Sequence, residues 1–139
     1  MHLTIDGFGG NPDLLANVKL VKALLDRYPE EIGMTPISQP HVFEYRGEKP
    51  EDWGVSGFVL IAESHIAIHT FPDHQQVWVD VFSCKGFDTD PAIAPIIEAF
   101  ELQNHRVHKL ERGLEYPHNV VDSIPVNHTE REQVAAGVK

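Results

Sequence analysis

The sequence predicts an α+β fold, a two-layer sandwich in which two helices pack on one face of a mostly antiparallel sheet. Three observations predict it. Short segments with alternating or branched apolar residues recur along the chain, which is typical of strands. Two segments with apolar residues at helical spacing lie between them. The chain has 139 residues, 42% of them hydrophobic, which is enough for one domain with its own core.

The first half of the chain begins with an alternating strand and then a helix. The helix is expected over residues 12–28, since Asn11 can cap it, Pro12 suits its first turn and Pro29 is expected to end it. The strand and the extended segments that follow the helix are expected at residues 2–8, 35–45, 55–63, 65–71 and 77–84.

A second helix is expected to open with Asp90 as its cap and Pro91 in its first turn. A last strand is predicted within residues 105–113. Residues 1–115 are therefore predicted to form a single domain. Residues 116–139 have little periodicity and are predicted to be a loosely ordered C-terminal extension.

The charge and composition exclude several classes of function. The formal net charge of −10 argues against nucleic acid or an anionic membrane as partner, because both require a cationic surface. The single cysteine allows no intrachain disulfide framework, and no apolar run is long enough to span a bilayer. The first residues do not read as a signal peptide. A soluble cytoplasmic protein is expected, and the negative charge fits either a positively charged substrate or plain solubility.

The segment AESHIAIHTFP, residues 62–72, has reactive groups in an otherwise apolar strand. The hydroxyl of Ser64 can attack the carbonyl of Glu63, provided that a base and oxyanion donors are present. Residues five apart in a strand point to opposite faces, so His69 reaches Ser64 only if the chain bends there. If residues 65–70 pair with 77–84, Cys84 comes close to Ser64, and the three side chains share one neighbourhood.

Structural roles account for the same residues equally well from the pattern alone. A lone intracellular cysteine is most often a small buried hydrophobe, and a histidine in a strand is most often a hydrogen-bonded structural residue. The pairs His65/His69 and His105/His108 lack a metal-ligand motif, because their segments read as strands, and no metal is expected. The residues by themselves indicate a soluble α+β domain with a serine, histidine and cysteine set.

Residues 54–88, GVSGFVLIAESHIAIHTFPDHQQVWVDVFSCKGFD, resemble the prokaryotic S-adenosylmethionine decarboxylase proenzymes, a pyruvoyl-dependent family. The resemblance rests on GVSG, ESH, IHT, VDVF and a cysteine in this order. It implies that Ser64 attacks the carbonyl of Glu63, that the chain is cut between the two, and that Ser64 becomes a pyruvoyl group forming a Schiff base with substrate. It also implies processing roles for Ser56 and His69, and makes Cys84 the proton donor in turnover.

The resemblance further implies a homodimer and a small-molecule substrate, S-adenosylmethionine, whose decarboxylated product supplies aminopropyl groups for spermidine synthesis. Asp73 stands where the family often has a glutamate near the substrate, although a turn role explains it equally well. The loop before GVSG and the segment HTFPD depart from the family pattern. A basic amino acid, ornithine or arginine, is therefore an alternative substrate, and an unprocessed binding or regulatory subunit is an alternative without catalysis.

Overall fold

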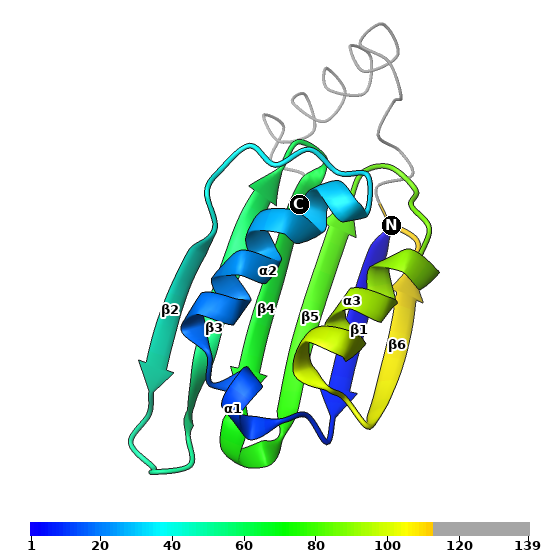
Figure 1. The fold of residues 1–139 in the computed structure, drawn as a ribbon. Helices are drawn as coiled ribbons and strands as arrows, with labels where there is room; N and C mark the ends of the chain where they lie inside the picture. The colour runs from blue at the N-terminus through cyan, green and yellow to red at the C-terminus, as the bar shows by residue number, and fades with distance from the viewer. Residues whose placement is uncertain (113–139) are drawn as a thin grey trace, which may run out of the picture.

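The computed structural model describes residues 1–112, so the predicted extension at 116–139 lies outside the described residues. The chain forms one antiparallel sheet with its helices on one face, which confirms the predicted α+β sandwich (Figure 1). The strands are β1 His2–Phe8, β2 His41–Arg46, β3 Trp53–Ile61, β4 Ser64–Phe71, β5 Gln76–Ser83 and β6 Asn104–Leu110. The helices are α1 Pro12–Leu15, α2 Val18–Glu31 and α3 Asp90–Phe100, with a 3₁₀ turn at Pro72–His74.

The strands follow the order β2-β3-β4-β5-β1-β6 across the sheet. Consecutive strands β2 to β5 pair as neighbours, whereas β1, from the start of the chain, lies between β5 and β6 (Figure 1). Each pairing is antiparallel, so short turns suffice between β3, β4 and β5. The antiparallel pairing places the start of β4, at Ser64, beside the end of β5, at Ser83.

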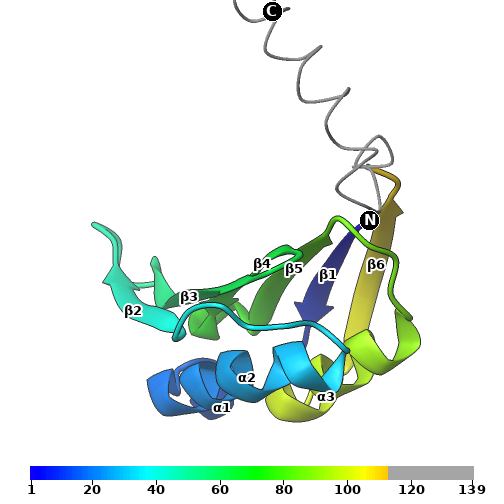
Figure 2. The ribbon, with the colours of Figure 1, turned by 90° about the horizontal axis from the view of Figure 1, so that it is seen from above.

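The core lies between the sheet and the helices, on the side where α2 and α3 pack (Figure 2). Strand β5 shows the alternation that builds it: Val77, Val79 and Val81 are buried toward the helices, as the sequence predicts. From the helices, Tyr28 and Phe100 are the largest fully buried side chains. The Tyr28 hydroxyl donates a hydrogen bond to the carbonyl of Ala92, which joins α2 to α3, and burial raises the pKa of Tyr28.

The predicted helix over 12–28 is wrong in its boundaries. It is two helices, because the side chain of Asn17 accepts a hydrogen bond from the N–H of Leu20 at 3.0 Å and starts α2 anew. Pro29 does not end α2, which continues to Glu31. Tyr28 and Pro29 are both buried against the core, and this packing carries the last turn past the proline.

Three smaller predictions also need correction. Thr89 occupies the cap position of α3, and Asp90 is its first helical residue. The extended segment at 35–45 becomes a strand only from His41, since Pro36 makes just an isolated bridge to Ile61. Strand β6 ends at Leu110. Among the described residues, no helix is both long and apolar enough to cross a membrane.

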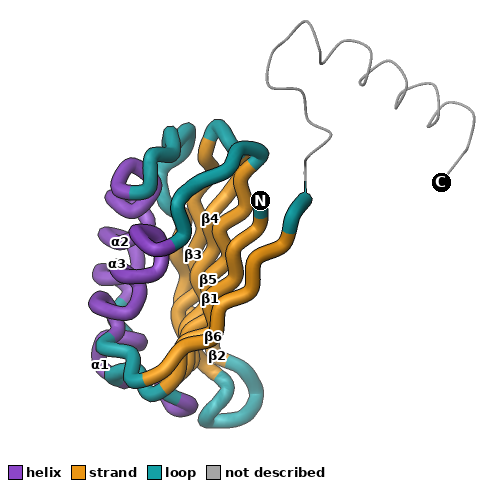
Figure 3. The backbone as a smooth tube through the Cα atoms, turned by 90° about the vertical axis from the view of Figure 1, so that its right-hand side faces the viewer, coloured by secondary structure: helices purple, strands orange, loops and turns teal. Residues whose placement is uncertain are grey.

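No helix within residues 1–112 covers the second face of the sheet (Figure 3). The register places on this open face a set of aromatic and histidine side chains, with several large hydrophobic residues exposed. An uncovered apolar face of this kind is typical of a surface that associates. The exposed large hydrophobic residues of the open face are Phe43, Tyr45, Phe58, Leu60, Trp78 and Leu110.

Candidate self-cleavage site at the β3–β4 hairpin

Ser64 lies at the first position of β4, directly after the turn that joins it to β3. Its backbone φ is +157°, a conformation that residues with a side chain rarely adopt and that stores local strain. Its hydroxyl lies 3.1 Å from Nδ1 of His65. The residue that follows the Glu63–Ser64 peptide bond therefore has a disfavoured backbone conformation, and its hydroxyl lies beside a group able to accept its proton.

The carbonyl of Glu63 accepts a hydrogen bond from the backbone N–H of Cys84 at 2.9 Å. The contact arises because Ser64 pairs with Ser83 in the register of β4 and β5, so the residue after β5 faces the turn. An N–H donor on this oxygen is what the attack of a hydroxyl on the carbonyl carbon requires, because negative charge develops there. The predicted proximity of Cys84 to Ser64 is confirmed at the level of the backbone.

His69 lies away from Ser64, at a paired position with Ser56. The Ser56 hydroxyl and Nδ1 of His69 are 2.9 Å apart on the open face. Five residues of strand separate Ser64 from His69, which corresponds to about 16 Å. The predicted single neighbourhood of serine, histidine and cysteine is therefore wrong within one protomer, because β4 runs on without the bend that it needs.

A pocket of about 770 Å³ lies where the β2–β3 loop meets the turn between β4 and β5, and neither Ser56 nor His69 is among its lining residues. Trp78, which pairs with His69 in the register, lines it together with Phe71, and the two rings are 4.5 Å apart. Asp73 lies in the 3₁₀ turn after β4 and is not among the residues that line this pocket. Sequence reasoning missed the lining groups from β2 and the acidic loop after it, which are Tyr45, Glu48, Lys49, Glu51 and Asp52.

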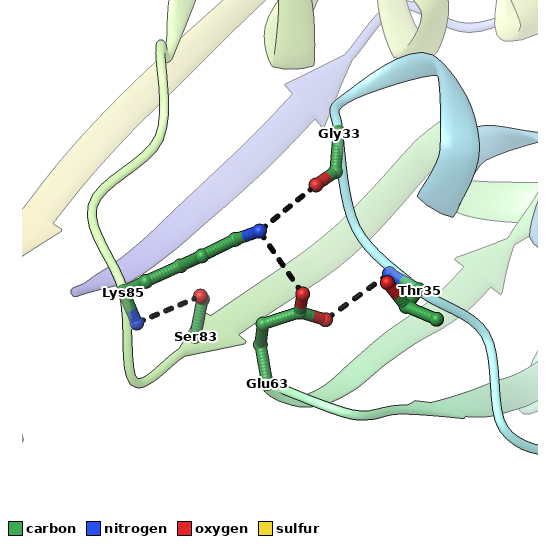
Figure 4. A network of polar contacts seen from close by, with 5 residues as sticks. All are labelled: Gly33, Thr35, Glu63, Ser83 and Lys85. Carbon is green, nitrogen blue, oxygen red and sulfur yellow. Dashed lines mark hydrogen bonds and ion pairs between the residues drawn. The ribbon is translucent and has the colours of Figure 1, made fainter. Parts of the chain in front are cut away.

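The side chain of Glu63 is fixed by a polar network that sequence reasoning also missed (Figure 4). One carboxylate oxygen accepts the N–H of Thr35 at 3.1 Å, and the other pairs with Nζ of Lys85 at 3.0 Å. Nζ also donates to the carbonyl of Gly33 at 3.1 Å, and the N–H of Lys85 donates to the Ser83 hydroxyl. Partial burial alone would raise the pKa of Glu63, but these donors lower it overall.

Within residues 1–112, no group of three or more His, Cys, Asp or Glu side chains is arranged to hold a metal ion. The groups that the site offers for chemistry are the hydroxyl, the imidazoles, the thiol and the polarised carbonyl already described. The fold and this turn define a class: two-layer α+β proteins with a candidate self-cleavage site at a hairpin end.

Comparison with known proteins gives the family. Residues 1–113 match the family described as S-adenosylmethionine decarboxylase. A proenzyme of that name from Thermodesulfovibrio yellowstonii is 38% identical over 116 residues, covering 81% of this chain and 80% of that protein. One from Clostridium botulinum is 33% identical over 114 residues, covering 81% and 92%. The crystal structure of the adenosylmethionine decarboxylase from Aquifex aeolicus superposes with a TM-score of 0.68 at 30% identity, covering 85% of this chain and 94% of that one.

The chain belongs to the S-adenosylmethionine decarboxylase family.

Proposed function

We propose that this protein cleaves itself between Glu63 and Ser64 and then decarboxylates S-adenosylmethionine by means of a pyruvoyl group made from Ser64. The observation that carries the proposal is the pair of features at one peptide bond. The Glu63 carbonyl already accepts an N–H from Cys84, and the residue that follows has a strained backbone. Membership of the family and the proenzyme names of its relatives support the same reading.

The proposed self-cleavage balances without a co-reactant other than water. Ser64 Oγ attacks the carbonyl carbon of Glu63, the C–N bond breaks, and the hydroxyl proton passes to the released amine of Ser64, giving an ester. Removal of the Ser64 Cα proton then expels the carboxylate of Glu63 as leaving group. The resulting enamine tautomerises, and one water molecule releases ammonia and leaves the pyruvoyl group at the start of the second chain.

The spatial separation of His69 from Ser64 supports a composite site in a homodimer. Two protomers stacked by their open faces about a two-fold axis perpendicular to the strands would bring the Ser64 end of one onto the Ser56–His69 end of the other, twice. Ser56 and His69 would then serve the partner's scissile bond as hydrogen-bond donor and proton carrier. Burial of exposed aromatic residues such as Phe58 and Trp78 supplies a driving force for the association.

The residues around Ser64 also fit the proposed turnover. The pyruvoyl carbonyl supplies an acceptor for the electrons left by departing carbon dioxide. We propose the thiol of Cys84 as the group that returns a proton to the substrate carbon, and the contact between the N–H of this residue and the Glu63 carbonyl supports it. The aromatic pocket with Phe71 and Trp78 suits the flat base of S-adenosylmethionine, and its acidic residues suit the sulfonium charge. Asp73, outside that pocket, stays a weaker candidate for substrate contact.

A basic amino acid is a second candidate substrate, and one observation favours it. Three carboxylates, Glu48, Glu51 and Asp52, surround the same pocket together with a single lysine, Lys49. The side-chain ammonium of ornithine or the guanidinium of arginine would meet this negative potential at least as well as a sulfonium. With either substrate, we propose that the reaction takes place in the cytoplasm. If the substrate is S-adenosylmethionine, its decarboxylated product would be used in spermidine synthesis.

The intact mass of the freshly purified protein under denaturing conditions tests the proposal, with the Ser64→Ala variant beside it. We expect two chains from the wild type, the first ending at Glu63 and the second lacking a free amino terminus, and one whole chain from the variant. Release of carbon dioxide from S-adenosylmethionine, ornithine and arginine then identifies the substrate. A wild-type chain that stays whole and inactive would support the non-catalytic subunit instead.

A further inference from the structure

We propose that Lys85 is a positioning residue for the self-cleavage: its ammonium holds the side chain of Glu63 and offsets the charge of that carboxylate while a second carboxylate forms on the same residue. The inference rests on the proposed function, since it concerns the rate of that cleavage. Lys85 follows Cys84 directly, in the loop after β5.

Lys85 contacts both the turn that contains the scissile bond and the segment after α2. Nζ pairs with one oxygen of Glu63 at 3.0 Å and donates to the carbonyl of Gly33 at 3.1 Å, while the other oxygen of Glu63 accepts the N–H of Thr35 (Figure 4). The side chain of Glu63 is only 11% exposed. The turn that contains the scissile bond is therefore tied to the segment after α2 and to the loop after β5.

Electrostatics gives this ion pair a role beyond holding the turn. Expulsion of the Glu63 α-carboxylate places a new negative charge a few bonds from the side-chain carboxylate of the same residue. Two negative charges so close repel each other, and an adjacent cation offsets this repulsion. Lys85 is the cation that contacts Glu63, and the lowered pKa of Glu63 agrees with its carboxylate being ionised beside that ammonium.

The test measures the first-order rate of self-cleavage by pulse–chase in cell-free translation. The variants are Lys85→Met, Lys85→Arg, Glu63→Gln and the double Glu63→Gln/Lys85→Met, with Lys22→Met as a matched control on the exposed side of α2. A glutamine at position 63 keeps an oxygen for the Thr35 N–H and loses only the charge. The double variant therefore shows whether Lys85 acts through the Glu63 carboxylate.

We expect Lys85→Met to slow cleavage about tenfold, a typical effect of removing one partner of a charged hydrogen bond. Lys85→Arg is expected to retain most of the rate, Lys22→Met to retain all of it, and Lys85→Met to change the rate by less than about twofold when Glu63→Gln is present. Thermal unfolding of Ser64→Ala with and without Lys85→Met is expected to show that both fold.

Two outcomes of the rate measurements would overturn the inference while leaving the proposed function intact. One is a wild-type rate in Lys85→Met. The other is equal slowing by Lys85→Met with Glu63 and with a glutamine there. Loss of the cooperative thermal transition in Ser64→Ala/Lys85→Met would also overturn it, because Lys85 would then be needed for folding. A wild-type chain that is never cleaved would instead refute the proposed function, and the inference with it.

Discussion

The hydroxyl of Ser56 and Nδ1 of His69 lie 2.9 Å apart across paired positions of β3 and β4, while Ser64 begins the same β4 at its opposite end. One protomer therefore presents two halves of a site on the same hairpin, separated along it. This relationship determines which experiments distinguish a site within one chain from a site shared between two.

Mixing two inactive variants is expected to restore cleavage. Neither Ser64→Ala nor His69→Ala should be cleaved by itself, since one lacks the nucleophile and the other the imidazole. In a mixed dimer, the His69→Ala chain keeps Ser64 and meets the intact His69 of its partner. Co-expression with distinguishable tags and intact mass measurement should show cleavage of the His69→Ala chain alone. Absence of cleavage in verified mixed dimers would place the whole site within one chain.

Substitution of Cys84 by serine is expected to separate cleavage from turnover. The contact with the Glu63 carbonyl comes from the backbone N–H of Cys84, which any residue other than proline supplies. Cleavage should therefore continue in Cys84→Ser, whereas decarboxylation should fall at least about a hundredfold, the lower end for loss of a general acid. Mass measurement and carbon dioxide release test the two parts. Full turnover in Cys84→Ser would rule out the thiol as proton donor.

The pH dependence of stability is expected to report the Glu63 carboxylate. Its pKa is lowered in the folded protein, so its contribution is fully present above the unfolded-state pKa of about 4.3 and is lost as pH falls from there through the folded-state pKa. Urea unfolding of Ser64→Ala with and without Glu63→Gln measures this. The difference between the two free energies of unfolding should shrink on acidification below that pH. A difference that does not change with pH would contradict the ionised pair.

Thr70 is expected to be essential to the packing of α1 on the sheet. Its buried hydroxyl donates to the carbonyl of Leu15 at 2.7 Å and accepts the N–H of Val55 at 2.9 Å. Thr70→Val leaves both groups without a partner and should lower the free energy of unfolding by about 1–3 kcal/mol. Thr70→Ser keeps the hydroxyl and serves as control. Urea unfolding in the Ser64→Ala background checks both, and a Thr70→Val variant as stable as its parent would contradict this role of the hydroxyl.

The strands and the layer order could be predicted because hydrophobic alternation reports burial directly. The alternation in β5 placed Val77 and Trp78 on opposite faces, and the structure confirms it. Helix ends were less predictable. The apolar periodicity does not say whether a helix ends at Asn17 or at Pro29, and tertiary packing decides this. The glycines of GVSG illustrate the same point: a Cβ on Gly54 would collide with the carbonyl of Thr70, a contact that only the folded sheet creates.

The candidate site could be predicted only in part, since strand register is needed to assemble it. The sequence suggested Ser64, Glu63 and Cys84 as neighbours, and pairing of β4 with β5 brings them together. It misplaced His69, whose distance from Ser64 depends on β4 running straight. It gave no signal for Lys85, because the partners of this side chain come from the loop after α2 and the β3–β4 turn, which are far apart in the sequence.

The place of β1 between β5 and β6 has a consequence for a cleaved molecule. A cut after Glu63 leaves β1, β2 and β3 on one polypeptide and β4, β5 and β6 on the other. Strand β1 of the first polypeptide then lies between β5 and β6 of the second. The two polypeptides cannot separate without breaking the backbone hydrogen bonds that join β1 to β5 and to β6. Once unfolded, they must find each other again by diffusion. Refolding of a cleaved protein would therefore depend on its concentration. The lifetime of the folded, cleaved protein would then be set by its unfolding rate.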